Sequence, residues 1–496
     1  MHSVDLTPQG VYREYMRGVD YNLAMDLYRT VETNENFFMG RQWEGVRANG
    51  LPTPVFNFLR RVVLFSVANV ISGKLKLNAA PLDTVTSHAH ETVSEILNGE
   101  FHAIFARNHV PGLLRTLCRA AAVDGDGCLY TYWDGVKGIV TEFLPNTAVL
   151  FGNPACAAVE RQPYIIIERR ELLSDLRRRA AARGLSQETV ESIRPDKKEG
   201  GRRESDDRHS EKATVLLRLW KDEETGEVMA FESTREVALG KAWSLGVRRY
   251  PVVWFSWEKD RDSYHGAALI TSLIPNQIFV NKLFAMSMIS LMSLAYPKVV
   301  YDKTRVKNWT NRVGAAIGIA GSVDGAARVV EGASVSPQIG QFIDLAVNYT
   351  QKFLGASDAA LGDVRPDNTS AIIALQRAST TPLSLTRQAL LECVEELGQV
   401  YIEFMAAYYA LRPMAIEAPQ GGTVEVPFDF SLLSAMPLQV ELEAGESAYW
   451  SEIASVQTLD NLLMQGKIST VDYLKRLPAG HISQREELIR AIEQAQ

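Results

Sequence analysis

Residues 265–298 read HGAALITSLIPNQIFVNKLFAMSMISLMSLAYPK, and this stretch decides how the rest of the chain is organised. It predicts one long helix that begins or bends near Pro275 and ends before Pro297, because proline removes a backbone donor and clashes with the preceding turn. The helix is apolar on almost every face, so it must be packed on most faces. Three serines at i, i+3 and i+6 form a narrow stripe, which permits a close helix neighbour or faces a polar lumen: Ser287, Ser290 and Ser293.

The most apolar part of this helix runs from Leu283 to Tyr296, about 14 residues that include the three serines. A membrane span needs roughly 20 mostly apolar residues. We therefore expect a buried helix rather than a membrane helix. The first residues, MHSVDLTPQG, have neither the basic nor the apolar region of a signal peptide, so no targeting signal is expected.

A second helix is predicted after a β-like excursion. Residues 298–336 are rich in glycine and in strand-forming residues, and Ser336 followed by Pro337 is typical of a helix start. Gly355 ends this helix. One of its faces is apolar and carries Ile339, Phe342, Ile343, Ala346, Val347, Phe353 and Leu354.

The sequence LGDVRPDNTSAIIALQRAST, at 361–380, predicts a polar loop that runs into a helix over about 369–411, bent at Pro382. Its carboxylates and hydroxyls suit either a catalytic loop or a mechanical part. A nucleophile needs an oriented base, and no histidine occurs between His265 and His481. A structural or contact role is therefore favoured for Asp363, Arg365 and Asp367. The second half of the helix has an apolar packing seam: Leu390, Val394, Leu397, Tyr401, Phe404, Tyr408 and Leu411.

The remaining segments mix helices and strands. Residues 10–110 are predicted to be helical with interruptions, including a helix over about 57–71, and a C-terminal helical tail is expected. Strands are predicted at DGDGCLYTYWDG, PYIIIERR, ATVLLRLW, EVMAFES, YPVVWFSW, TVEVPFDFSLL and LQVELEAGE. The charged run over 194–212 mixes both signs and predicts a solvated loop, with a basic interaction arm as the alternative. The expected fold class is α+β, mostly helical.

Composition excludes some classes of protein. A chain of 496 residues is long enough for more than one core. A net charge of −7 argues against a protein that mainly coats nucleic acid. The four cysteines form no C-x-x-C pair and have no zinc spacing, so reduced, buried thiols are expected at Cys118, Cys128, Cys156 and Cys393.

No enzyme motif is found in the sequence. It has no G-x-x-x-x-G-K-[ST], no G-x-S-x-G and no H-E-x-x-H. His88 and His90 would point about 200° apart on a helix, so they predict exposed residues rather than a metal site. The prediction is no catalytic residue, no metal and no cofactor.

The order of these parts resembles the portal proteins of tailed bacteriophages, the head-to-tail connector rings through which DNA enters and leaves the capsid. The resemblance covers most of the chain and begins with FFMGRQWEGVRANGLPTPVFNFLRRVV at 37–63. It continues through VDGDGCLYTYWD at 123–134, the long helix at 265–298 and the loop at 361–379, and it ends with LLMQGKISTVDYLKRLP at 462–478.

This resemblance implies a portal-type fold with named regions. The wing would comprise residues 1–265, with a long kinked helix and wing return over 369–445. The stem helices would be 266–297 and 337–356, the clip 298–336, the tunnel loop 357–368 and the crown 446–496. It also implies a non-enzymatic homo-oligomeric ring, typically a dodecamer, at one capsid vertex of the virion, assembled in the host bacterial cytoplasm. The implied partners are the terminase large subunit, capsid or scaffold protein, a head-completion adaptor and double-stranded DNA, with no membrane.

The resemblance implies roles for several residues. The tunnel loop would place Asp363, Arg365, Asp367 and Asn368 at the DNA channel. Stem and clip cations would be Lys282, Lys303, Arg305, Lys307 and Arg312. Trp309 would serve in docking on the clip, with a buried Trp of a small β core as the alternative. The stem would pack through Leu283, Met286, Phe342 and Ile343.

Charge is consistent with a conduit. Residues 266–356 carry +4, which leaves −11 for the rest of the chain. DNA must be tolerated in a channel without being gripped, because each phosphate contact adds salt-dependent affinity. Two other functions stay open: a pore-forming or membrane-associated oligomer, and a metal-dependent DNA-processing packaging enzyme acting through Asp363 and Asp367.

Overall fold

The computed structural model describes most of the chain. The described residues are 5–73, 75–81, 88–196, 211–295, 298–310, 312, 316–330, 338–353, 381–417, 423–436, 438–444, 456, 458–477, 488–489 and 492.

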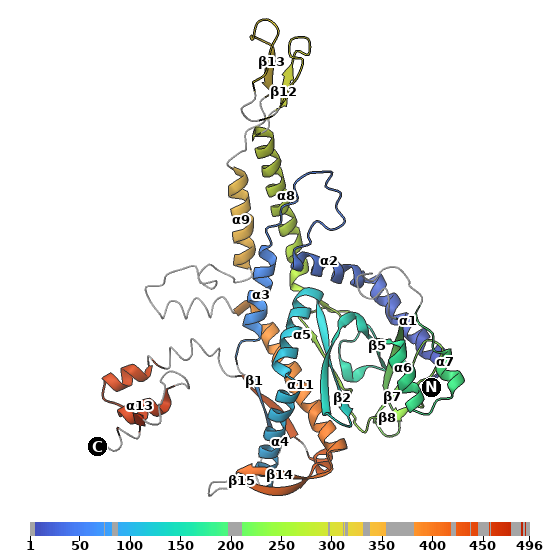
Figure 1. Cartoon of the computed structure of the whole chain (residues 1–496). Helices are drawn as coiled ribbons and strands as arrows, with labels where there is room; N and C mark the ends of the chain where they lie inside the picture. The colour runs from blue at the N-terminus through green and yellow to red at the C-terminus, as the bar shows by residue number, and fades with distance from the viewer. Residues whose placement is uncertain are drawn as a thin grey trace.

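Two helices project together from the body of the molecule and carry a β-hairpin at their far end (Figure 1). They are α8 (Leu269–Ala295) and α9 (Gln338–Phe353), and the hairpin pairs β12 (Lys298–Tyr301) with β13 (Ala327–Val330). The Asn276 amide of α8 donates to the Thr350 hydroxyl of α9 over 3.1 Å, which ties the two helices near the body. Both predicted helices are confirmed, and Pro275 lies inside the first.

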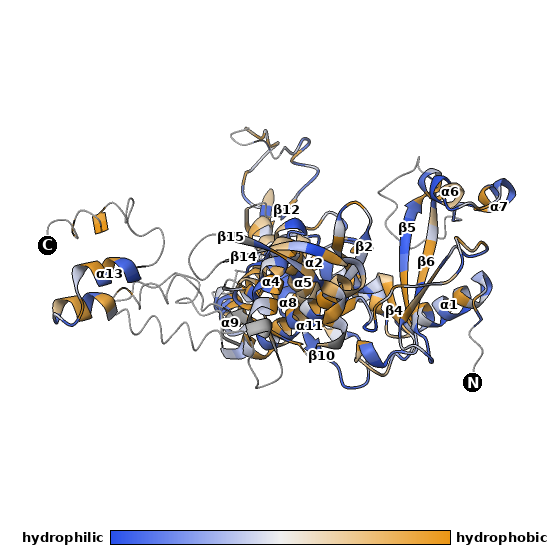
Figure 2. Cartoon of the chain, turned by 90° about the horizontal axis from the view of Figure 1, so that it is seen from below, coloured by the Kyte–Doolittle hydropathy of each residue, from blue (hydrophilic) through white to orange (hydrophobic). Residues whose placement is uncertain are grey.

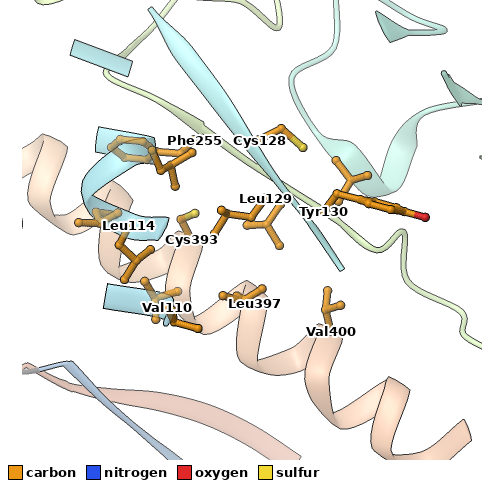
Figure 3. Packing of buried hydrophobic residues seen from close by; sticks show 14 of the residues in the cluster. Val110, Leu114, Cys128, Leu129, Tyr130, Phe255, Cys393, Leu397 and Val400 are labelled. Atoms are coloured by element: carbon orange, nitrogen blue, oxygen red, sulfur yellow. The ribbon is translucent and has the colours of Figure 1, made fainter. Parts of the chain in front are cut away.

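The core of the body lies where an antiparallel sheet, ordered β3-β2-β9, packs on α5 (Val110–Asp124) and α11 (Ser384–Tyr408). In Figure 3, Val110 and Leu114 point toward Leu129 of the sheet, and Leu397 meets them from the other helix. The elements of this core are α4 (His88–Arg107), α5 (Val110–Asp124), β2 (Asp126–Asp134), β3 (Gly138–Pro145), β9 (Val252–Ser256), η3 (Thr381–Leu383) and α11 (Ser384–Tyr408).

The predicted packing seam of α11 is confirmed from Leu390 to Phe404, all of whose seam residues are buried. Leu411 is an exception: it is exposed and begins a strand, because the helix ends at Tyr408 and Ala410 takes a positive φ of 52°. Residues 369–380 of the predicted helix lie outside the described residues.

Three N-terminal helices cover the body and the root of α8. Two of them begin at a side-chain cap. The Thr7 hydroxyl accepts from the Gly10 N–H, and the Asn57 side-chain carbonyl oxygen accepts from the Arg60 N–H over 3.2 Å. The helix predicted at 57–71 is thereby confirmed. The helices are α1 (Pro8–Ala24), α2 (Leu27–Met39) and α3 (Phe58–Val70).

A second, five-stranded antiparallel sheet lies beside the body, on the side away from α9 (Figure 2). Its strands are β4 (Val149–Phe151), β5 (Ile165–Leu172), β6 (Lys212–Lys221), β7 (Val228–Ser233) and β8 (Trp243–Ser244). Two helices that the sequence analysis did not predict follow β5: α6 (Leu173–Ala182) and α7 (Gln187–Ser192). Residues 197–210 of the charged run lie outside the described part, and Ile193, just before the run, is buried.

Short pairings complete the fold. β1 (Leu75–Pro81) pairs with β16 (Leu438–Ala444), β14 (Leu411–Glu417) with β15 (Thr423–Asp429), and β10 (Glu258–Lys259) with β11 (Gly266–Ala267). The other short elements are η1 (Asn146–Ala148), η2 (Val159–Arg161), η4 (Phe430–Ala435) and the C-terminal α13 (Thr470–Arg476). Together these elements confirm a mixed α+β fold.

The cysteine prediction is confirmed in part. Cys118, Cys128 and Cys393 are free and buried, while Cys156 is only half-buried. Burial raises the pKa of the three buried thiols, so they stay protonated and unreactive at neutral pH.

Candidate functional site

The projecting helix α8 has a buried root and an exposed outer half. Near the body, Ile270, Leu273 and Val280 are buried. Farther out, Leu291 is 54% exposed and Leu294 is 58% exposed. The prediction that α8 is packed on most faces is therefore wrong for a single chain, because within the described residues α9 is the main neighbour of its outer half. Exposed apolar side chains gathered on one projecting helix are characteristic of an interaction site.

A buried polar network holds the root of α8 in the body. The Gln277 side-chain amide donates to the side-chain carbonyl oxygen of Asn281 over 2.9 Å and to the backbone carbonyl of Phe56 over 2.8 Å. The Asn281 side-chain amide in turn donates to the side-chain carbonyl oxygen of Gln42 over 2.6 Å. The network joins α8 to the segment at 37–63, and sequence reasoning missed it. The only signal was that polar side chains occupy a strongly apolar helix, which implies buried partners.

The four predicted stem-packing residues divide into two groups. Leu283 and Ile343 are half-buried, and Ile343 packs against the main core. Met286 is 53% exposed and Phe342 is 51% exposed, so neither is covered by its own chain.

The serine stripe of α8 becomes more exposed toward the far end of the helix. Ser287 and Ser290 are half-buried, and Ser293 is exposed. The Ser287 hydroxyl donates to the Leu283 carbonyl over 2.9 Å, which satisfies it within the helix.

The β12–β13 hairpin has its own small packing centre. Val306 and Ala326 are fully buried, and the rings of Tyr301 and Trp309 stack with centroids 5.2 Å apart. Trp309 is half-buried, so it both supports this centre and presents one side to solvent.

A short turn orders the polar side of the hairpin. The Asp302 carboxylate accepts from the Thr304 hydroxyl and backbone N–H, and Arg305 lies 3.5 Å from it. These hydrogen bonds, above all that of the hydroxyl, lower the pKa of Asp302.

The predicted stem and clip cations are all on the surface. Lys282 is exposed on α8, and the others are exposed on the segment between β12 and β13: Lys303, Arg305, Lys307 and Arg312. The predicted tunnel-loop residues lie outside the described part of the chain: Asp363, Arg365, Asp367 and Asn368.

Two further tests bear on chemistry and on membranes. Among the described residues, no cluster of three or more His, Cys, Asp or Glu could hold a metal ion. By length and composition alone, α8 is the one described helix that is long and apolar enough to cross a membrane, and little of it is buried in the chain.

Comparison with known proteins gives one match. No curated protein matches the chain. Residues 167–413 match the family model described as Phage P22-like portal protein. The matched range runs from β5 through α8, the hairpin, α9 and α11 to the start of β14, so it contains the whole projecting part of the molecule. This match confirms the resemblance drawn from the sequence, and the chain belongs to the family of P22-like phage portal proteins.

Proposed function

We propose that this chain forms a closed homo-oligomeric ring at one capsid vertex, with a central channel for packaging and ejection of double-stranded DNA. The observation that carries the proposal is the apolar surface that α8 and α9 leave uncovered within the described residues. It includes Met286, Leu291 and Leu294 of α8, with Phe342 and Leu345 of α9.

Further copies of the same chain are the proposed cover for this surface. Homo-oligomers with closed symmetry are the commonest assemblies, and a head-to-tail contact that closes on itself gives a ring. The helices would then form a stem, with ring number left to measurement. In this arrangement the serine stripe of α8 offers a position where a neighbouring helix approaches closely.

Charge supports a conduit that tolerates DNA. Four of the proposed contact cations lie between β12 and β13, beyond the apolar part of the stem. Exposed cations without deep burial bind phosphate weakly and in a salt-dependent way, which suits sliding. The tunnel loop at 357–368, with one arginine and two aspartates in 363–367, would line the channel without holding phosphate tightly.

Partners are proposed by region. The hairpin, with Trp309 and its cations, would dock the terminase large subunit during packaging and a head-completion adaptor afterwards. The wing would contact capsid or scaffold protein. In this role the protein is structural and performs no catalysis.

One observation favours a second function. Because α8 meets the length and hydropathy requirements of a membrane span, a membrane-associated oligomer is the alternative. The polar network at Gln42, Gln277 and Asn281 argues against it, since it fixes the lower part of α8 inside the protein body.

Purification without detergent distinguishes the two. The ring proposal predicts a soluble oligomer of uniform mass by light scattering and no flotation with lipid vesicles. Protein that stays in solution only with detergent, or that floats with vesicles, would contradict the ring proposal and support the alternative.

A further inference from the structure

A cavity of about 640 Å³ opens where three parts of the body meet. Its walls come from the junction of α4 and α5, the turn between β2 and β3, and the start of β14. β14 lies at the end of the molecule opposite the β12–β13 hairpin (Figure 1). The cavity is therefore separate from the stem and from the cations proposed for the channel.

The charge of this cavity is wholly positive. Arg107, Lys137 and Arg412 line it, and no carboxylate does. Among the described residues, none of these three cations forms an ion pair. The nearest acid along the chain, Asp134, accepts from the backbone N–H groups of Val136 and Lys137, both over 2.8 Å, so it is occupied in shaping the turn. Glu100 of α4, whose negative charge acts on the Tyr409 hydroxyl, lies outside the lining. The lining itself therefore has an excess of positive charge, which favours an anionic ligand.

Both guanidinium groups are held in position. The Arg412 Nε donates to the Tyr409 carbonyl over 3.0 Å, and its guanidinium carbon lies 3.9 Å from the centre of the Tyr409 ring. An Arg107 Nη1 donates to the Lys137 carbonyl over 3.4 Å. A guanidinium has five N–H donors, so each arginine keeps donors for a ligand. Fixed donors lose little conformational entropy on binding.

Tyr409 supplies a second, independent sign of a ligand. Its side chain lines the cavity and is only 3% exposed. The Arg107 guanidinium hydrogen-bonds to its buried hydroxyl, but a guanidinium can only donate, so the hydroxyl proton itself meets no acceptor among the described residues. A buried donor left without an acceptor costs stability. An anionic oxygen in the cavity would accept this hydrogen bond.

The remaining wall is rigid and partly aromatic. The Asn108 amide donates to the carbonyls of Ile104 and Ile139, each over 3.0 Å, and its oxygen accepts from the Thr141 N–H. Trp133 stacks on Tyr408 with centroids 4.9 Å apart and lines the cavity. The volume exceeds that of one phosphate, and an aromatic wall beside cations suits a nucleotide.

We propose that this cavity is a phosphate-binding site for a phosphate monoester or diester. Arg107, Lys137 and Arg412 neutralise the charge, and the Tyr409 hydroxyl donates to a phosphate oxygen. Arginine forks match the geometry of phosphate oxygens, and such charge-assisted hydrogen bonds are the strong ones. A free nucleotide and the DNA backbone share this chemistry and are the two sources of the ligand. The proposal is independent of ring formation.

The test measures binding of inorganic phosphate, AMP and a short DNA duplex to the full chain by calorimetry. We expect saturable binding of AMP, weakened roughly tenfold or more by Arg107→Gln combined with Arg412→Gln. Lys241→Gln is the matched control, since Lys241 is an exposed cation between β7 and β8. Tyr409→Phe keeps the ring packing and is expected to weaken binding several-fold.

The outcomes separate the sources of the ligand and the rival explanations. If the duplex displaces AMP, both share the site; if only the duplex binds and the double variant weakens it, DNA is the ligand. Equal binding by the double variant and the Lys241 control would overturn the proposal. So would the absence of binding by all three probes, or loss of oligomers in the double variant with phosphate binding intact, because the cavity would then be a subunit contact.

Discussion

The Nδ1 atom of His265 lies 3.2 Å from the Asp126 carboxylate, and both side chains are buried. The same carboxylate accepts a hydrogen bond from the Gly266 N–H over 2.6 Å. The Nε2 atom of His265 lies 3.0 Å from the side-chain carbonyl oxygen of Asn22. Asp126 begins β2, and His265 immediately precedes β11 and α8. This contact therefore fixes the projecting helix to the central sheet.

We predict that Asp126→Ala strongly destabilises the protein. It removes the acceptor of a buried imidazole and of the backbone N–H of half-buried Gly266, a loss that costs about 2–4 kcal/mol in the free energy of unfolding. Denaturant unfolding of the variant measures this. Asp262→Ala, at an exposed carboxylate, is the control and should change stability little. Equal denaturant midpoints of unfolding for Asp126→Ala and Asp262→Ala would show that the contact of Asp126 with His265 does not anchor α8.

A second prediction concerns pH. Burial, assisted by the negative charges of Glu35 and Asp126, raises the pKa of Asp124 to about 7, although Arg119 opposes the shift. Because the folded pKa lies above the unfolded one, the folded state binds this proton more tightly. The stabilisation is complete below about pH 4 and is lost as pH rises through about 7.

Asp124→Asn should remove this dependence. The melting temperature of the variant relative to the wild type should rise between about pH 4 and pH 8, because the amide cannot ionise. Melting curves across this range measure the difference. A constant difference between the two proteins would show that Asp124 ionises as easily in the folded chain as in the unfolded one.

A third prediction concerns the hairpin. Trp309→Ala removes the ring stacked on Tyr301 and should weaken docking of terminase or adaptor roughly tenfold, while oligomers still form. Trp309→Phe keeps an aromatic ring and should retain most of the affinity. The test is the affinity of each variant for purified terminase or adaptor. If the alanine variant binds as tightly as the wild type, Trp309 serves only in packing of the hairpin.

A fourth prediction concerns the tunnel loop. Deleting residues 363–367 should leave oligomers and terminase binding intact but reduce the DNA retained in particles, because the loop would act on DNA only in the channel. Genome content per particle, measured beside oligomer counts, is the test. Full, stable particles would make the loop a simple connector, and loss of oligomers would make it part of the fold.

Local sequence patterns predicted much of this structure, whereas contacts between residues far apart in the sequence could not be predicted. The helix predicted at 57–71 and the apolar length of α8 are local features that the sequence reveals. The contact of Asp126 with His265 joins positions 139 residues apart, and no periodicity signals it.

The same limit explains why α6 was not predicted and why the exposure of the outer half of α8 was not foreseen. α6 follows a strand in a charged stretch. Its apolar residues Leu173, Leu176 and Ala180 pack against residues that are distant in sequence: Ala213 and Val215 of β6, and Val237 and Leu239 after β7. Apolar character predicted that α8 would be covered, but it could not say whether its own chain or another copy covers it.

The central claim is that the apolar stem surface joins copies of the chain into a ring. Electron microscopy of the purified protein beside the variant Leu283→Asp with Met286→Asp tests it most directly. A control variant, Leu23→Asp with Met464→Asp, places the same charges at exposed apolar residues of other elements. We predict rings with a central hole for the wild type and the control, and monomers or aggregates for the stem variant. Normal rings from the stem variant, or wild-type particles without a central hole, would contradict the claim.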